Sequence, residues 1–469
     1  MKNRHYIKNI GIALLLSLFS VGASAQQTLR TGYFLKGNPY RYRLNPSFGA
    51  EQNYIALPVL GNLNIATTGN VGLADFVYDA PNGSDLVTFM HPSVDTDDFL
   101  GGLDDENRMF ADIDVTLLSA GFGAFGGYNT IDIGVHSRTG INLPYDMFKF
   151  MKDMGGTEYT ISDMNMTTSN YVDIALGHSR KITKDLRVGA RLKFLFGLGY
   201  ADVVFDRMDV VMNNKQWVIN AKGSANIALG GAYTHNAERM VNGKPAVDGY
   251  DDISVGLNGF GAAIDLGVTY DLSNVLTEGL VVSASVNDLG FMNWNNVAKA
   301  GISHDAPFVF DGFKNIAMHD DVPGANIEDQ FEDLRDDLEE FFSLEDRGEG
   351  SHSNMLSATL NVGVEYEMPF YRKLSVGALY TSRFDKIYPL HQFSLMANVA
   401  PVKWLDMAVS GTASNMGFGF GAMANVHLTG FNLFVGTDCF VGDVGKQFIP
   451  LDNMNASVSF GINIPFGRN

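Results

Sequence analysis

Apolar and polar residues alternate along the stretch 417–441. Every second residue of Phe418–Leu428 is apolar, and apart from Met423 the residues between them are small or polar. Because successive side chains of a strand point to opposite faces, this pattern predicts a strand with one apolar face. Thr429-Gly430 then predicts a two-residue turn, which pairs Leu428 with Phe431 and Ala424 with Val435 in an antiparallel hairpin. The apolar residues of both strands therefore lie on the same side.

The same two-faced pattern recurs along most of the chain, in segments near residues 112–117, 131–136, 172–177, 186–196, 262–271, 356–366 and 457–466. One hairpin fits a soluble sheet as well as a membrane barrel. The recurrence decides between them, because short breaks alternate with long insertions at 139–168, roughly 231–255 and roughly 292–352. Many segments are also near the roughly 9–11 residues that a tilted strand needs to cross a bilayer. The pattern predicts an all-β fold, a transmembrane antiparallel β-barrel of about 14 strands.

The first 25 residues have the features of a secretory signal peptide. Lys2, Arg4 and Lys8 form a basic region, and Ile10–Phe19 is an apolar run too short to span a bilayer as a helix. Ala23-Ser24-Ala25 provides small residues before a cut at Gln26. We therefore expect export and a place in the cell outer membrane. No later apolar run reaches the length of a transmembrane helix.

Residues 26–111 differ from the rest of the chain, which predicts a second structural unit. This region has many turn-forming residues, and its apolar pieces are short. Such a segment is too polar to face lipid and suits an N-terminal plug in the lumen with a connecting segment, and the barrel is expected to occupy 112–469. One barrel loop, 326–343, has apolar residues at helical spacing and a face dense in carboxylates. That acidic helix is either a cation or partner site or, as we favour, a solvated helix over the barrel mouth.

Charge and cysteine content exclude several classes of function. The formal net charge is -19, which argues against nucleic-acid partners. The single cysteine, Cys439, excludes an intrachain disulfide framework.

The sequence contains no candidate catalytic or metal site. The chain lacks a Gly-x-Ser-x-Gly pentapeptide, and no His or Cys cluster has metal-ligand spacing. The alternation places His136 and His427 on the lumen face and His178 on the apolar face, without a serine that the sequence would place nearby. We expect no enzyme, no metal and no cofactor.

Charged residues on the lumen face are the remaining candidates. Arg187, Arg191 and Lys193 lie on one expected strand, and Asp265 and Asp271 lie on another. They are suited to pair across the interior, to anchor the plug, or to set the selectivity of an open pore. Pairing is favoured, because charges in a narrow interior need partners.

The signal peptide, the segments Leu44-Asn45-Pro46-Ser47-Phe48 and Leu57-Pro58-Val59-Leu60-Gly61-Asn62, and the barrel that follows resemble an uncharacterised family of Gram-negative outer-membrane barrels. That family is distantly similar to the long-chain fatty-acid transporter superfamily, where the matching positions are Asn45 and Pro46. The usual alanine after the proline is Ser47 here. The distant resemblance implies a hatch over residues 29–90 and a hydrophobic ligand that leaves sideways through the wall.

Two functions follow as expectations. The first is passive transport of a hydrophobic or amphipathic small molecule through the membrane, with membrane lipid around the barrel. The second is a non-transporting surface scaffold, or a subunit of an envelope or secretion assembly with a protein partner.

Overall fold

The structure is a computed structural model of the 469-residue chain. It describes residues 29–50, 52–72, 75–79, 86–152, 158–212, 216–254, 256–302, 307–311, 333–338, 341–387, 389–439 and 455–468. The expected signal peptide lies outside these residues. Half of the expected helix 326–343 also lies outside them, and within its described parts, 333–338 and 341–343, residues 333–338 and 341 are helical.

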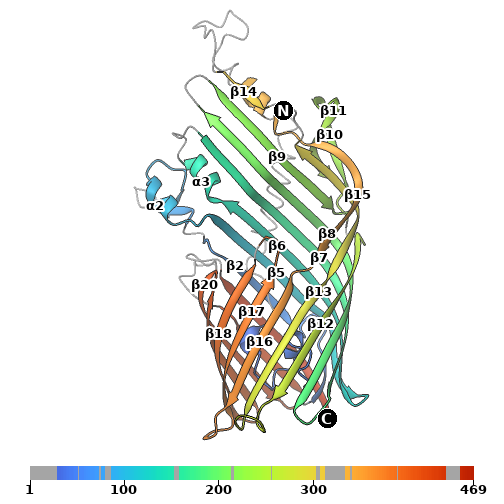
Figure 1. The fold of residues 1–469 in the computed structure, drawn as a ribbon. Coiled ribbons are helices and arrows are strands. Elements are labelled where there is room, and N and C mark those ends of the chain that lie inside the picture. The colour runs from blue at the N-terminus through green and yellow to red at the C-terminus, as the bar shows by residue number, and fades with distance from the viewer. Residues whose placement is uncertain are drawn as a thin grey trace, which may run out of the picture.

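The chain folds into a closed antiparallel barrel of fourteen strands, which confirms the expected fold (Figure 1). Thirteen wall strands are continuous: β5 (Glu106–Ala124), β6 (Gly127–Pro144), β7 (Glu158–Lys181), β8 (Leu186–Met212), β12 (Gly259–Asp271), β13 (Leu280–Ile302), β16 (Ala358–Glu367), β17 (Leu374–Phe384), β18 (Leu390–Val402), β19 (Leu405–Ser414), β20 (Gly417–Leu428), β21 (Phe431–Thr437) and β22 (Ala456–Arg468). The hairpin β20–β21 pairs Leu428 with Phe431 and Ala424 with Val435, as its alternation predicts.

The fourteenth wall strand is split in two and closes the barrel. β1 (Gln52–Ala56) and β2 (Leu63–Gly69) each pair with β22 on one side and with β5 on the other. The wall therefore begins at Gln52, and the expectation that the plug and its connection extend to residue 111 is corrected. The sequence pattern missed this strand because the break at 57–62 leaves two pieces too short to show a full alternation.

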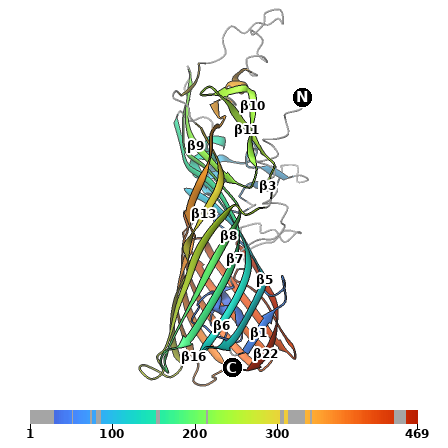
Figure 2. The same ribbon diagram turned by 90° about the vertical axis from the view of Figure 1, so that its right-hand side faces the viewer.

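Several wall strands continue far beyond the membrane-crossing length. β8 has 27 residues, β7 has 24 and β13 has 23, whereas β16 has 10. Their upper parts form a tall curved sheet with β9 (Trp217–Ala228), β14 (Phe308–Phe310) and β15 (Glu345–Met355). Figures 1 and 2 show this sheet rising on one side of the barrel only. Much of the chain that the sequence pattern predicts as long loops is therefore β-strand.

Small structural units are attached to this tall sheet, which we call the extension. The hairpin β10 (Ala232–Val241) and β11 (Lys244–Asp251) lies within the expected loop 231–255. A second unit consists of β3 (Val77–Asp79), β4 (Leu86–Thr88), α2 (Thr96–Gly101) and α3 (Tyr145–Lys152), which share a cluster around Phe99 and Phe148. No helix in the described ranges is both long and apolar enough to cross a membrane. The extension therefore has hydrophobic cores of its own.

The outer face of the barrel carries an apolar band bounded by large side chains at both ends. One boundary runs through Phe260, Phe291, Phe384 and Phe418, and the other runs through turn residues that include Phe125, Phe370 and Trp404. The second boundary lies at the end with the short turns and the C-terminus (Figure 1). In outer-membrane barrels the short turns face the periplasm, so we assign this end to the periplasmic side.

The depth of this band is testable on β18. Leu395 faces outward near the middle of the band and is 59% exposed, whereas Trp404 lies in the adjacent turn. Replacing Leu395 with arginine is expected to lower the free energy of unfolding in lipid by about 2–4 kcal/mol, and the same change at Trp404 by about 0–1 kcal/mol. Urea unfolding in phospholipid vesicles measures both values. Equal losses at the two positions would contradict the membrane placement.

Candidate functional site: the plugged lumen

The N-terminal segment, residues 29–48, lies inside the barrel. It forms two short turns of 3-10 helix, η1 (Arg30–Gly32) and η2 (Pro39–Arg43). Proline at the first position of η2 sets the backbone angle that a helix start needs, and Asn38 accepts a hydrogen bond from Tyr40 N at 3.1 Å. In the described part of the chain, every backbone–backbone hydrogen bond observed for residues 29–48 joins residues within four positions of each other. The segment is a compact body of its own.

Side chains attach this segment to the wall. The Leu44 carbonyl accepts hydrogen bonds from Ser285 Oγ at 2.6 Å, Asn287 Nδ2 at 2.8 Å and Asn361 Nδ2 at 3.1 Å. At the other end of the segment, the backbone groups Arg30 N and Thr31 N donate hydrogen bonds to the Asp438 carboxylate, at 2.8 Å and 2.7 Å. Wall side chains thus satisfy backbone groups that the segment leaves unpaired, as buried groups require.

The Asn45-Pro46-Ser47 sequence docks on two glycines of the wall. Gly189 of β8 and Gly267 of β12 are register partners, and Cβ atoms at these positions would overlap Pro46 and Asn45. Asn45 Nδ2 donates to the carbonyls of Ala284, at 3.3 Å, and Val268, at 3.4 Å, and Asn45 Oδ1 accepts from Ser47 N at 3.0 Å. The absence of side chains on the wall therefore creates the seat for this loop.

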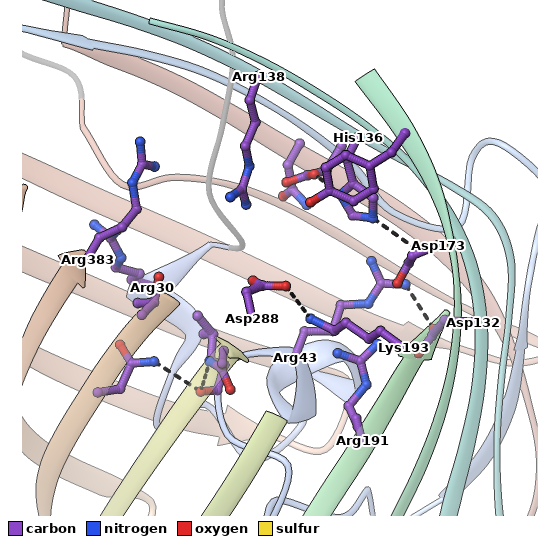
Figure 3. Close-up of a pocket in the computed structure, with 17 residues that line it drawn as sticks. Arg30, Arg43, Asp132, His136, Arg138, Asp173, Arg191, Lys193, Asp288 and Arg383 are labelled. Carbon is purple, nitrogen blue, oxygen red and sulfur yellow. Dashed lines mark hydrogen bonds and ion pairs between the residues drawn. The ribbon is translucent and has the colours of Figure 1, made fainter. Parts of the chain in front are cut away.

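A chain of ion pairs crosses the lumen above this seat, and Figure 3 labels its members Arg43, Asp132, Arg191, Lys193 and Asp288. Asp132 contacts Arg43 of the segment and Arg191 of β8, each at 2.9 Å. Arg191 also contacts Asp265 at 2.8 Å, and Lys193 joins Asp265 at 2.9 Å to Asp288 at 2.7 Å. Tyr42, also from the segment, donates a hydrogen bond to Asp132 at 2.7 Å. The buried charges have partners, and the segment supplies one of the cations.

A second group of charges lies beside the first. Asp114 and Asp173 bind the two ring nitrogens of His136, and Asp112 contacts Arg383 at 3.1 Å and Arg138 at 3.4 Å. Except for Asp112, these side chains border a cavity of about 90 Å³ together with Arg30 (Figure 3). Burial lowers the pKa of Arg30 to about 10, and the charge of Asp438 opposes this shift. Arg30 therefore stays a cation at neutral pH, and the cavity suits a few waters rather than a hydrophobic ligand.

A cluster of mostly apolar side chains packs above the charges. Trp294 is fully buried among Tyr171, Leu195 and Met292, and its indole stacks on Tyr200 with ring centroids 5.1 Å apart. Trp294 Nε1 donates to Asn354 Oδ1 at 2.8 Å. The lumen thus contains the N-terminal segment, the ion pairs and this aromatic cluster.

The structure brings some of the candidate residues from the sequence together and leaves others apart. Arg191, Lys193 and Asp265 come together in the ion-pair chain, and Asn45 and Pro46 meet the wall. Arg187 lies below the chain, where it donates to Ser179 Oγ at 3.0 Å and borders Gly49. Asp271 is set apart at the start of the β12–β13 turn, where it accepts a hydrogen bond from Ser273 N at 2.9 Å.

Three members of the ion-pair chain, Arg43, Asp132 and Asp288, are absent from the candidates that the sequence provides. The alternation already puts Asp132 on the lumen face. Its pairing with Arg191 depends on the register between β6 and β8 across the intervening β7, which one sequence does not reveal.

The histidines have structural partners. His136 has a carboxylate at each ring nitrogen, so neither nitrogen is available to activate a serine. His427 contacts Asp406 at 2.6 Å, and His178 contacts Asn129 at 2.9 Å on the outer face. Among the described residues, no group of three or more His, Cys, Asp or Glu side chains is placed to hold a metal ion.

A larger pocket opens at the periplasmic mouth, between the segment and the wall. It has a volume of about 460 Å³ and combines apolar side chains, among them Phe34, Leu35 and Val399, with charged ones that include Glu367 and Lys373. This volume falls within the range of small-molecule sites, and the mixed lining suits an amphipathic ligand.

Solved structures with distant similarity to this chain include two toluene transporters and a FadL homologue. The toluene transporter TodX of Pseudomonas putida is 9% identical over 96% of this chain and 98% of its own, with a TM-score of 0.39. The toluene transporter TbuX of Ralstonia pickettii is 9% identical over 96% and 97%, with a TM-score of 0.40. A FadL homologue of Pseudomonas aeruginosa is 10% identical over 95% and 100%, with a TM-score of 0.41.

These three likenesses are distant. No curated protein matches the sequence significantly. One family model matches residues 46–438, which include most of the barrel and the split strand that closes it. The chain belongs to the family of unknown function DUF5723.

Proposed function

We propose that this protein, exported by its first 25 residues, is a passive conduit of the outer membrane for a hydrophobic or amphipathic small molecule, opened by displacement of residues 29–48. The observation that carries the proposal is how this segment is held. Its observed backbone–backbone bonds are local, and side chains make its contacts with the wall. A body held in this way can move without breaking the hydrogen-bond ladder of the barrel.

The ligand class follows from the pocket at the periplasmic mouth. Phe34 and Leu35 of the segment form part of its apolar lining, so movement of the segment changes the pocket itself. A ligand with an apolar body and a polar end matches this surface. The small charged cavity deeper in the lumen is too polar for such a molecule, so passage requires the segment to leave its seat.

A reversible disulfide between the segment and the wall tests this proposal. Ser47 Oγ lies 2.5 Å from Thr269 Oγ1 of β12, so cysteines at both positions are close enough to form a disulfide in a Cys439→Ser background. In proteoliposomes that take up a fluorescent medium-chain fatty acid, oxidation of Ser47→Cys/Thr269→Cys is expected to abolish uptake, and reduction is expected to restore it.

The matched control places a disulfide within the wall. Ser394 Oγ of β18 lies 2.9 Å from Thr412 Oγ1 of β19, and both residues are in adjacent wall strands. Oxidation of Ser394→Cys/Thr412→Cys is expected to leave uptake unchanged. Uptake that continues through the oxidised Ser47→Cys/Thr269→Cys barrel would refute the proposed movement.

The tall extension favours a second candidate, a surface scaffold or a subunit of an envelope assembly. β7 and β8 carry the sheet well beyond the apolar band, and Tyr250 of the hairpin β10–β11 packs on it against Ala201, Ile227 and Ala298. Removal of residues 232–251 separates the two candidates. A scaffold would lose stoichiometric cross-linking to an envelope protein in cells, whereas a conduit would keep its uptake.

A further inference from the structure

A groove on the lipid-facing side of the barrel differs from the rest of the apolar band. It crosses β8, β12, β13 and β16 and has a volume of about 590 Å³. Ala190 and Ala284 contribute small side chains to it, and Val188 and Leu266 are among the larger ones that border them. Because these residues face outward from adjacent strands, the groove lies along the hydrocarbon region of the membrane. Its shape and chemistry suit an acyl chain.

A cation stands at the periplasmic end of this groove. Arg180, near the end of β7, lines the groove and is exposed, and His178 beside it is held by Asn129. The neighbouring turns expose Phe125 (84%) and Ile182 (55%), which places Arg180 close to the boundary of the apolar band. At that depth its guanidinium reaches the headgroup region. No ion pair of Arg180 is found among the residues that the structure describes.

A second lipid-facing groove provides the comparison. It crosses β16–β20, has a volume of about 880 Å³ and is lined by no charged residue in the described chain. Both grooves can accommodate acyl chains, but only the first one joins an apolar surface to a guanidinium. The planar guanidinium donates paired hydrogen bonds to phosphate oxygens, a geometry that water and lipid esters do not match.

We propose that the groove at Arg180 binds an anionic glycerophospholipid of the periplasmic leaflet, with an acyl chain along Ala190 and Ala284 and the phosphate at Arg180. The site is separate from the lumen and independent of the proposed conduit. Basic residues at a membrane interface attract anionic headgroups, and the apolar groove adds selectivity for a lipid over a free anion.

Native mass spectrometry of the detergent-purified protein, titrated with phosphatidylglycerol, tests this site. Arg180→Gln is expected to weaken phosphatidylglycerol binding about five- to tenfold. Arg372→Gln is the control, because Arg372 is an exposed arginine of another periplasmic turn that pairs with Glu278. It is expected to bind phosphatidylglycerol as the unmodified protein does.

Two further arms identify the source of the affinity. Ala190→Phe fills the groove and is expected to weaken binding of phosphatidylglycerol while leaving Arg180 in place. Diacylglycerol, which lacks the phosphate, is expected to bind the unmodified protein and Arg180→Gln equally weakly, and inorganic phosphate is expected not to compete. Equal phosphatidylglycerol binding by Arg180→Gln and Arg372→Gln would overturn the proposal, as would full competition by inorganic phosphate.

Discussion

Replacing Arg191 with alanine is expected to lower the free energy of unfolding in lipid by about 3–5 kcal/mol, because it removes one partner from a buried ion-pair chain. Arg191 lies between Asp132 and Asp265 and is only 4% exposed. Without it, two carboxylates lose a cation in a region with little access to water. Its guanidinium also lies 5.3 Å from the centroid of the Tyr42 ring, so the change reaches the N-terminal segment directly.

The same substitution is expected to raise conductance in planar bilayers, since Asp132 is the wall residue that binds both Tyr42 and Arg43 of the segment. Arg191→Lys keeps the charge but cannot contact both carboxylates with one planar fork, so an intermediate effect is expected. Arg372→Ala, which removes an exposed pair with Glu278, is the control and is expected to cost about 0–1 kcal/mol. A closed Arg191→Ala barrel of unchanged stability would show that the ion-pair chain neither stabilises the fold nor holds the segment.

The membrane-crossing strands were predictable because one physical rule governs them. A strand between lipid and a polar interior must alternate, and β8 does so from Leu186 to Phe194, as does most of the hairpin β20–β21. The rule fails where those two environments end. Beyond Phe196 the remaining residues of β8 no longer face lipid, so nothing in their order separates a long strand from a loop.

The site was predictable in its residue types more than in its partners. The alternation of strand faces alone places Arg191, Lys193 and Asp265 on the lumen face, and they form adjacent ion pairs there. The partners from elsewhere, Asp132 and Arg43, depend on strand register and on the path of the N-terminal segment. Neither is encoded in local alternation. The glycine pair on which Asn45-Pro46-Ser47 docks also depends on strand register, because Gly189 and Gly267 become neighbours only once β8 pairs with β12.

Replacing Gly267 with valine is expected to displace the N-terminal segment without substituting any charged residue. A Cβ at this position would overlap Asn45 Oδ1 and come within 2.9 Å of Pro46 Cδ and Ser47 N. The wall backbone cannot retreat, because β12 is paired with both β8 and β13 along its length. The loop at Asn45 must therefore leave its seat, which also breaks the hydrogen bonds from Asn45 to Val268 and Ala284.

The readout is single-channel conductance and uptake of the fatty-acid probe, both of which are expected to rise well above the unmodified values. Valine favours strands, so the barrel itself is expected to fold. Gly411→Val is the matched control, because a Cβ at Gly411 of β19 would meet only Phe420 Cε1 at 4.0 Å, and conductance should stay unchanged. Since Gly267→Val substitutes no charged residue, an open barrel in this variant would assign the closure to the seating of Asn45-Pro46-Ser47, with the Arg43–Asp132 pair lost only as a consequence of the movement. If the variant folds and stays closed, the segment does not close the lumen through this contact.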